Sequence, residues 1–225
     1  MDSPLIELVA ANVAFVGTHF AMSHPLRAPM AKLLGEKGLS LVYSLVSVVT
    51  LFWVYVAYTK SPNADLAGSG EMGGVTVSIL TFIAMVFFAG SFSGNPALPG
   101  PNAKAQTNLE PRGLLKVTRH PMMWGFAFWA LSHILLWANW RSVITAFAIG
   151  VLALLGAHLQ DKKKNITMGT DWENWVSKTS YWPRLSMLPN CGIIFWIIGG
   201  LAWLAMSWAH LYFGGIPAGI WLWYQ

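Results

Sequence analysis

The stretch RHPMMWGFAFWALSH, from Arg119 to His133, decides how the rest of the chain is interpreted. It is an apolar run that begins with Arg-His-Pro and carries a second histidine, His133, deep inside. Proline in the first turn gives a helix a defined start. An ionisable side chain within a membrane is costly, so His133 indicates a functional site if this stretch crosses one.

The composition is that of an integral membrane protein. Of the 225 residues, 55% are hydrophobic and 10% are charged, and the mean hydropathy is +0.51. Soluble domains carry about 25% charged residues. We therefore expect the lipid bilayer as the partner, and no nucleic acid, because the net charge of +5 comes without a basic stripe or recognition motif. The single cysteine, Cys191, excludes internal disulfides, a Cys-ligated iron–sulfur cluster and covalently attached haem.

Six apolar stretches are candidates to cross a bilayer, which takes about 20 residues per helix. We expect an all-α polytopic membrane protein, a bundle of six transmembrane helices that forms a single domain over residues 1–225. The fourth stretch is short, so its ends are the least well defined. The expected spans are Leu5–Ser23, Leu39–Tyr58, Val75–Phe92, Met122–Ala138, Val143–Leu159 and Gly192–Phe213.

Lysine and arginine are distributed unevenly between the loops. Twelve of the 14 lie in the loops after the first, third and fifth spans, and only Lys60 and Arg141 lie on the opposite side. By the positive-inside rule, those three loops are cytoplasmic and both termini are on the outer side. The N-terminal stretch lacks a positive n-region, so we interpret it as a retained span. We expect a bacterial inner-membrane protein.

Two segments on the expected cytoplasmic side are not spans. Residues 93–113 are rich in proline and glycine, which predicts a loop. Residues 169–185, GTDWENWVSKTSYWPRL, place three tryptophans among polar residues, and this favours a segment that lies on the membrane surface. A simple tether between spans explains the same pattern equally well.

The histidines are the main reactive groups. His120 and His133 lie 13 residues apart on one helix, about 20 Å along its axis, so they cannot share a metal. His133 needs a partner from another span, and His19 in the first span is the candidate nearest in depth. Two imidazoles from different helices, with aromatic and small neighbours, suit haem b; the alternative is two histidines hydrogen-bonded to adjacent helices. The expected neighbours are Phe126, Trp129, Ala130 and Trp137 around His133, and Asn12, Phe15 and Val16 around His19.

Other ionisable residues gather at the cytoplasmic ends of the spans. A cytoplasmic mouth is expected to be lined by His24, His120, His158, Arg27, Arg119 and Asp161, although solvated interfacial positions explain His24 and His158 as well. Arg119 and His120, at the start of a helix, suit binding of an anionic headgroup or a haem propionate. We include Arg27 with them among the candidate cofactor-binding residues. The small-residue stretch IIGGLAWLAMS suits helix packing within or between chains.

Three segments together resemble the NnrU family of bacterial membrane proteins and, more distantly, zeta-carotene isomerase. They are GTHFAMSHPLRAPMAKLLGEKGLSLVYSLVS, GLLKVTRHPMMWGFAFWALSH and QDKKKNITMGTDWENWVSKTS. The resemblance implies haem b on two histidines, which by position fall on His19 and His133, and redox-dependent isomerisation of a hydrophobic polyene. It also implies, through the family name, a link to nitric oxide metabolism and denitrification. The isomerase has a cysteine where this chain has Ala130, so a thiol switch is not expected here.

A fainter resemblance is to membrane methyltransferases of the isoprenylcysteine type, which bind S-adenosylmethionine. They also have Arg-His-Pro at the start of a late helix, followed by acidic residues and a tryptophan-containing run. Here Met123 stands where a tyrosine is usual, and Gln160-Asp161 stands where a glutamate pair is usual. This activity, and a non-enzymatic role as an accessory subunit of a respiratory complex, are the two alternatives.

Overall fold

The computed structural model describes residues 3–63, 66–100 and 102–224. In that part of the chain, every regular element is a helix, which confirms the all-α prediction. The long helices are α1 (Ser3–Ser23), α2 (Arg27–Lys60), α3 (Gly70–Gly90), α5 (Pro121–Leu136), α6 (Trp140–Met168) and α8 (Ile193–Gly214). The short ones are α4 (Ala103–Gln106), η1 (Gly113–Lys116), α7 (Thr170–Lys178), η2 (Leu185–Cys191) and η3 (Gly219–Trp223).

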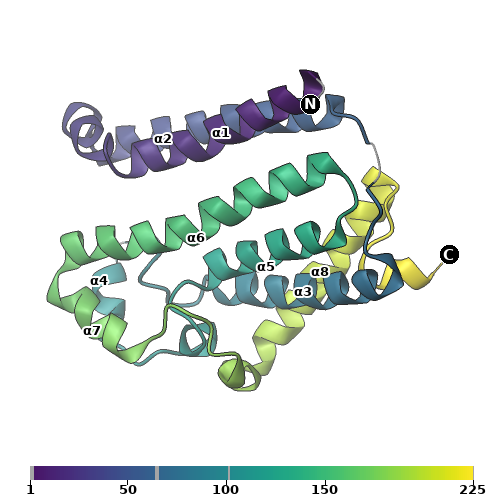
Figure 1. The fold of residues 1–225 in the computed structure, drawn as a ribbon. Helices are drawn as coiled ribbons and strands as arrows, with labels where there is room; N and C mark the ends of the chain where they lie inside the picture. Colours follow the sequence, from purple (N-terminus) through teal and green to yellow (C-terminus); the bar gives the residue numbers. More distant parts are fainter. Residues whose placement is uncertain (1–2, 64–65, 101, 225) are drawn as a thin grey trace.

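The long helices pack in the order α2, α1, α6, α5, α3 and α8 (Figure 1). They form a row in which each helix contacts mainly the next, so α6 packs against both α1 and α5. The short helices α4 and α7 lie near the end of α6. One side of the bundle contains both the start of α2 and the end of α6. We call this side the basic end, because Arg27, Lys163 and Lys164 lie there.

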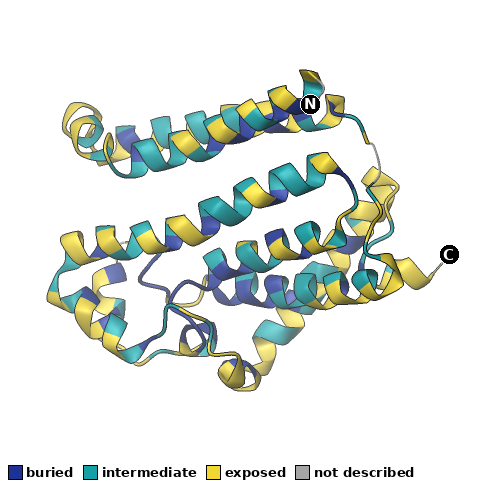
Figure 2. Cartoon of the chain, viewed as in Figure 1, coloured by how far each residue is buried: buried dark blue, intermediate teal, exposed yellow. Residues whose placement is uncertain are grey.

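Five of the long helices are long and apolar enough to cross a membrane: α1, α2, α3, α6 and α8. Exposed residues recur along these helices (Figure 2), and many of them are large and apolar, such as Leu45 and Phe52 on α2 and Leu201 on α8. Such side chains suit contact with lipid. The sixth, α5, is apolar but has only 16 residues, so the count of six spans stays a prediction.

The ends of α5 explain its length. Pro121 occupies its first turn, as the sequence predicted, and Trp137 ends it in the left-handed region with φ 51°. Asn139 then caps α6, its side-chain oxygen accepting a hydrogen bond from the Ser142 amide at 2.9 Å. The tight turn between α5 and α6 leaves no room for a longer α5.

Two helices extend well beyond the spans that we expected. α2 begins at Arg27 instead of Leu39, with a kink at Gly35, where φ is 70°. α6 continues past Leu159 to Met168. Lysine, glutamate and glutamine are good helix formers but not apolar, so hydropathy detects only the part of each helix that suits lipid.

Glycines allow the closest helix contacts. A Cβ on Gly199 of α8 would lie 2.7 Å from the Cα of Val86 in α3, and one on Gly125 of α5 would lie 3.0 Å from the Ala84 carbonyl oxygen. Such positions tolerate only glycine without a shift of the backbone. The small-residue stretch in α8 therefore packs within this chain at Gly199.

The tryptophan-containing segment does not lie wholly at the surface. Trp172 and Trp175 of α7 are each 1% exposed and pack with Ala97 and with Leu115 of η1, which both lie between α3 and α5; of the three tryptophans in this segment, Trp182 is the exposed one. Trp172 and Trp175 are three residues apart and therefore share one face of the helix. Such a face suits a small core as well as a membrane surface, and here it forms a core.

Candidate functional site

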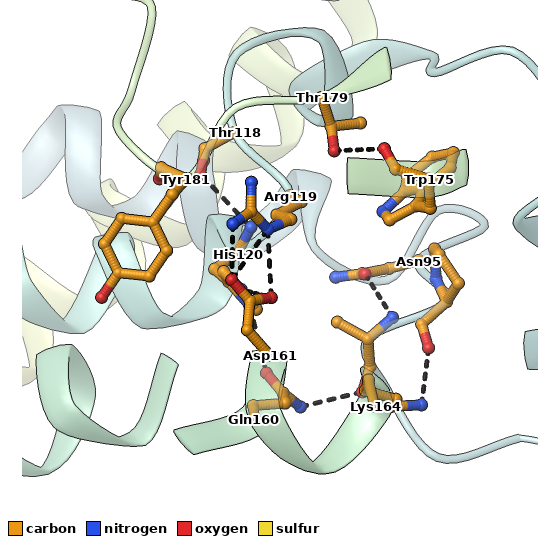
Figure 3. A network of polar contacts seen from close by, with 12 residues as sticks. Asn95, Thr118, Arg119, His120, Gln160, Asp161, Lys164, Trp175, Thr179 and Tyr181 are labelled. Atoms are coloured by element: carbon orange, nitrogen blue, oxygen red, sulfur yellow. Dashed lines mark hydrogen bonds and ion pairs between the residues drawn. The ribbon is translucent and has the colours of Figure 1, made fainter. Parts of the chain in front are cut away.

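Arg119, at the start of the decisive stretch, is held by a carboxylate from α6. Its Nε donates to both oxygens of Asp161 at 3.0 Å, and its Nη2 also contacts this carboxylate (Figure 3). The Arg119 side chain is 10% exposed and the Asp161 side chain 18%. A paired arginine and carboxylate in such a site fixes the relative position of two helices.

His120 shares the same carboxylate. Its Nε2 lies 2.8 Å from Asp161 Oδ1, and its Nδ1 lies 3.2 Å from Gln160 Oε1. The Gln160 amide in turn donates to the Ala97 carbonyl at 2.8 Å. The His120 ring is fully buried, with both nitrogens occupied.

The loop that follows α7 closes over these two residues. The Arg119 amide donates to the Ser180 carbonyl at 2.8 Å, and Trp124 Nε1 donates to the Tyr181 carbonyl at 2.9 Å. The Arg119 guanidinium lies 5.5 Å from the centre of the Tyr181 ring. Burial, with the nearby Asp161 carboxylate, raises the pKa of the Tyr181 phenol, which therefore stays neutral at physiological pH.

This cluster joins α5, α6 and the loop after α7. The contacts of Arg119 and His120 are made within the chain, and His120 has no free ring nitrogen for an external anion. The geometry thus favours a positioning role for both residues over the binding of a propionate or a headgroup that we predicted from their place at a helix start.

A cavity of about 1000 Å³ lies next to this cluster, between α1, α2, α5 and α6. Its wall includes Gln160, the hydrogen-bond partner of His120. Four of the residues that the sequence predicted as ligands or cofactor contacts line it: His19, Phe15, Arg27 and Phe126. They come from three helices, so the fold brings them to one place.

His19 is held on the cavity wall in one orientation. Its Nδ1 lies 2.7 Å from the Phe15 carbonyl oxygen, and its ring packs against Phe15 and the edge of Tyr43. A carbonyl oxygen only accepts, so Nδ1 carries the proton in the neutral ring and Nε2 has a free lone pair. That Nε2 lies 3.2 Å from the oxygen of the Ser47 hydroxyl, which donates its own proton to the Tyr43 carbonyl at 2.7 Å. Nε2 is therefore the atom of His19 able to bind a metal.

His133 has the same arrangement on α5. Its Nδ1 lies 2.9 Å from the Trp129 carbonyl oxygen, and its ring packs on the Trp129 indole with 4.2 Å between centroids. Nε2 again keeps the lone pair. The histidine nearest to it is His210 of α8, at 6.4 Å between ring centroids. Ala130, one turn earlier, is buried against α6.

The structure does not bring His19 and His133 into contact. Their helices nevertheless share a second, apolar hollow of about 550 Å³, lined by Val16 and Gly17 of α1 and by Ile134 of α5. These positions are within three residues of His19 and next to His133. Phe126, two turns before His133, lines the large cavity.

The sequence analysis missed several residues of the cavity. Lys163 and Lys164 were counted only as loop charges, whereas both line the wall, and Tyr43 packs on His19. One signal was available: a helix that continues past Leu159 places residues 160, 163, 164 and 167 on one face.

Comparison with known proteins agrees with the resemblance noted from the sequence. The family model NnrU, described as NnrU protein, matches residues 7–218. The 15-cis-zeta-carotene isomerase, chloroplastic, of Arabidopsis thaliana is 25% identical over 188 residues, 80% of this chain and 50% of the relative. The protein of that name from Zea mays is 25% identical over 193 residues, 83% of this chain and 52% of the relative. The chain thus spans about half the length of these curated relatives, and no solved structure matches it significantly.

Proposed function

Because the chain belongs to the NnrU family, we propose that it is a membrane-embedded haem b protein that isomerises a double bond of a hydrophobic polyene in a redox-linked reaction. The relatives named 15-cis-zeta-carotene isomerase support this class of substrate and reaction. A carotenoid-like substrate is apolar, which matches a chain built of apolar helices with an apolar hollow between α1 and α6.

The observation that carries the proposal is the orientation of His19 on the wall of the large cavity. Nδ1 lies on a carbonyl oxygen, which favours a lone pair on Nε2, and the walls of the cavity include aromatic and aliphatic side chains; the Ser47 oxygen is 3.2 Å from Nε2. These are the properties of a histidine that ligates a metal, since the second nitrogen of such a ring is normally bound to an acceptor. The residues present therefore fit a haem.

We propose that His19 and His133 would hold the haem iron, with His19, Phe15 and Phe126 on the wall of the large cavity and with His133, Trp129 and Ala130 outside its described lining. His133 has the same fixed tautomer, and its helix, like that of His19, packs on α6. A bound haem b would supply one-electron redox chemistry. The chain's own residues would orient the ligand nitrogens, keep water from the apolar hollow and hold the polyene against α1 and α6.

In this proposal the chain crosses the inner membrane of a bacterium six times, with both termini on the outer side. Lys162, Lys163 and Arg27 then lie on the cytoplasmic side, as the positive-inside rule requires. The short helix α5 would cross with its start at the buried Arg119–Asp161 pair, which is compatible with local thinning of the bilayer.

The methyltransferase alternative gains no support from the geometry. The Arg-His-Pro motif and Gln160-Asp161 are bonded to each other, whereas binding of S-adenosylmethionine would need some of these groups free. Calorimetry with S-adenosylmethionine on the purified protein tests this alternative, and we expect no binding at high micromolar concentration.

An isomerase assay tests the proposed activity. Membranes from a bacterial host that expresses the chain are incubated with 15-cis-zeta-carotene under oxidising and under reducing conditions, and the isomers are separated by liquid chromatography. We expect loss of the 15-cis isomer in one redox state only, and no loss with the His19→Ala variant. Equal isomer ratios with and without the protein in both redox states would contradict the proposed activity.

A further inference from the structure

Lys164 is a buried cation for which the described residues provide no counter-ion. The residue is 8% exposed, and its ammonium donates one hydrogen bond, to the Pro96 carbonyl at 2.7 Å. It forms no ion pair with any carboxylate in residues 3–63, 66–100 or 102–224. An ammonium has three donors, and a buried charge without a partner is costly. Among the described residues Lys164 therefore has the Pro96 carbonyl as a hydrogen-bond acceptor but no counter-ion, and it lines the large cavity.

The charges around Lys164 add to this excess. Lys163 and Arg27 line the same end of the cavity and lie close enough to each other to interact electrostatically. The one carboxylate among the lining residues is Glu36, which pairs with Arg27 at 2.8 Å. Three cations thus share one anion at the basic end of the cavity, where an added anion would be stabilised.

The rest of the cavity has the opposite character. Beyond the basic end, its walls are apolar side chains from four helices, with His19 among them; these include Phe15, Leu39, Leu51, Phe126, Ile149 and Leu152. A ligand that fills the whole cavity therefore has an apolar body, an atom that the His19 imidazole can bind, and an anionic end. Haem b has these three features, because its two propionates extend from one edge of an apolar macrocycle.

We propose that Lys164, with Lys163, binds the propionate carboxylates of the haem, in place of Arg119 and His120. This inference rests on the proposed haem function and adds the direction of the cofactor: its propionate edge faces the basic end. Arg27 is the secondary contact, because Glu36 already neutralises its charge in part. Lys164 therefore also links the cofactor to the Pro96 loop.

The test compares haem b with its dimethyl ester, which lacks the carboxylates. Protein purified from haem-limited cells is titrated with each ligand, and binding is followed by the Soret absorbance. For Lys164→Met and Lys163→Met, we expect haem b to bind about tenfold or more weakly, the loss of one charge-assisted hydrogen bond, and the ester to bind as to the wild type. Lys162→Met is the matched control, because Lys162 is exposed and does not line the cavity.

For Glu36→Gln we expect the opposite change, tighter binding of haem b. A purely structural role of the two lysines would not produce this change. Removing this carboxylate frees Arg27, so haem b should bind more tightly and the ester should be unaffected. This variant and Lys163→Met decide the question if Lys164→Met does not fold. Unchanged haem b affinity in both variants would overturn the inference. It would also be overturned if native mass spectrometry showed that Lys164→Met loses bound phosphatidylglycerol but retains haem. A wild-type protein that binds neither ligand would instead contradict the proposed function.

Discussion

His120 Nε2 lies 2.8 Å from Asp161 Oδ1, and Arg119 Nε donates to both oxygens of the same carboxylate at 3.0 Å. Arg119 and His120 are thus hydrogen-bonded to a residue 42 and 41 positions later in the chain, in α6 and seven residues before its end. This relationship sets the relative height of α5 and α6, and with it the height of His133 against α1. The motif acts on the proposed haem site through position and not through direct contact.

Replacing His120 should therefore lower stability more than it changes the cofactor. His120→Ala removes the histidine contacts to Gln160 Oε1 and Asp161 Oδ1, although Asp161 keeps Arg119 and Gln160 keeps the Ala97 carbonyl, and the loss costs about 1–3 kcal/mol. We expect a lower melting temperature in detergent, with unchanged haem per folded protein. His158→Ala is the control, because His158 is exposed on the same helix as Asp161. Normal stability of His120→Ala, with loss of haem, would instead support a direct role in binding the cofactor.

Two adjacent glycines of α8 should respond differently to the same change. Gly199→Ala places a Cβ 2.7 Å from the Val86 Cα, so the two helices must move apart, which typically costs about 1–3 kcal/mol. Gly200→Ala places it at 3.5 Å from the Phe82 ring, an ordinary contact. Thermal unfolding should show a clear loss for the first variant only. Equal stability of the two variants would contradict the close packing of α8 on α3.

The predicted topology can be tested by labelling of single cysteines. The native Cys191 is buried, so a Cys191→Ala background should fold normally and give no signal. In intact cells, a membrane-impermeant maleimide should label Lys60→Cys and reach Lys162→Cys only after the membrane is permeabilised. Both lysines are exposed. Labelling of Lys162→Cys from outside would reverse the orientation, and equal labelling of both positions would contradict the span count.

Much of the fold follows from the sequence because apolar length and loop charge are local signals. The ends of α1, α3 and α8 lie within a few residues of the expected spans, and Pro121 does start α5. The polar extensions of α2 and α6 were missed, because a hydropathy pattern ends where the lipid-compatible part of a helix ends. These extensions form the basic end of the large cavity.

The site was less predictable, because its contacts join distant segments. That His19 packs on Tyr43 and lies beside Ser47 depends on how α1 meets α2. That Lys164 is buried depends on the path of the Pro96 loop. The role of Arg119 depends on Asp161, 42 residues later. A helical face can be read from residue spacing, but the element that covers this face cannot.

Removing either proposed ligand should change the spectrum of the haem. His19→Ala or His133→Ala leaves one axial position open to water, so we expect a shift from the low-spin to the high-spin state, seen in the Soret band and by electron paramagnetic resonance. His24→Ala is the control: His24 lines the same cavity but is not assigned as a ligand. His210→Ala tests the other imidazole near His133. A high-spin spectrum for His210→Ala together with a normal one for His19→Ala would replace His19 by His210 as the second ligand.

The most direct test of the account is the haem content of the wild-type protein. The chain is expressed in haem-sufficient cells, purified in mild detergent and assayed by absorbance and by pyridine haemochrome. The account predicts a Soret band, a b-type haemochrome and about one haem per chain, in a six-coordinate low-spin state. A colourless, folded protein that gains no Soret band when haem b is added would contradict it.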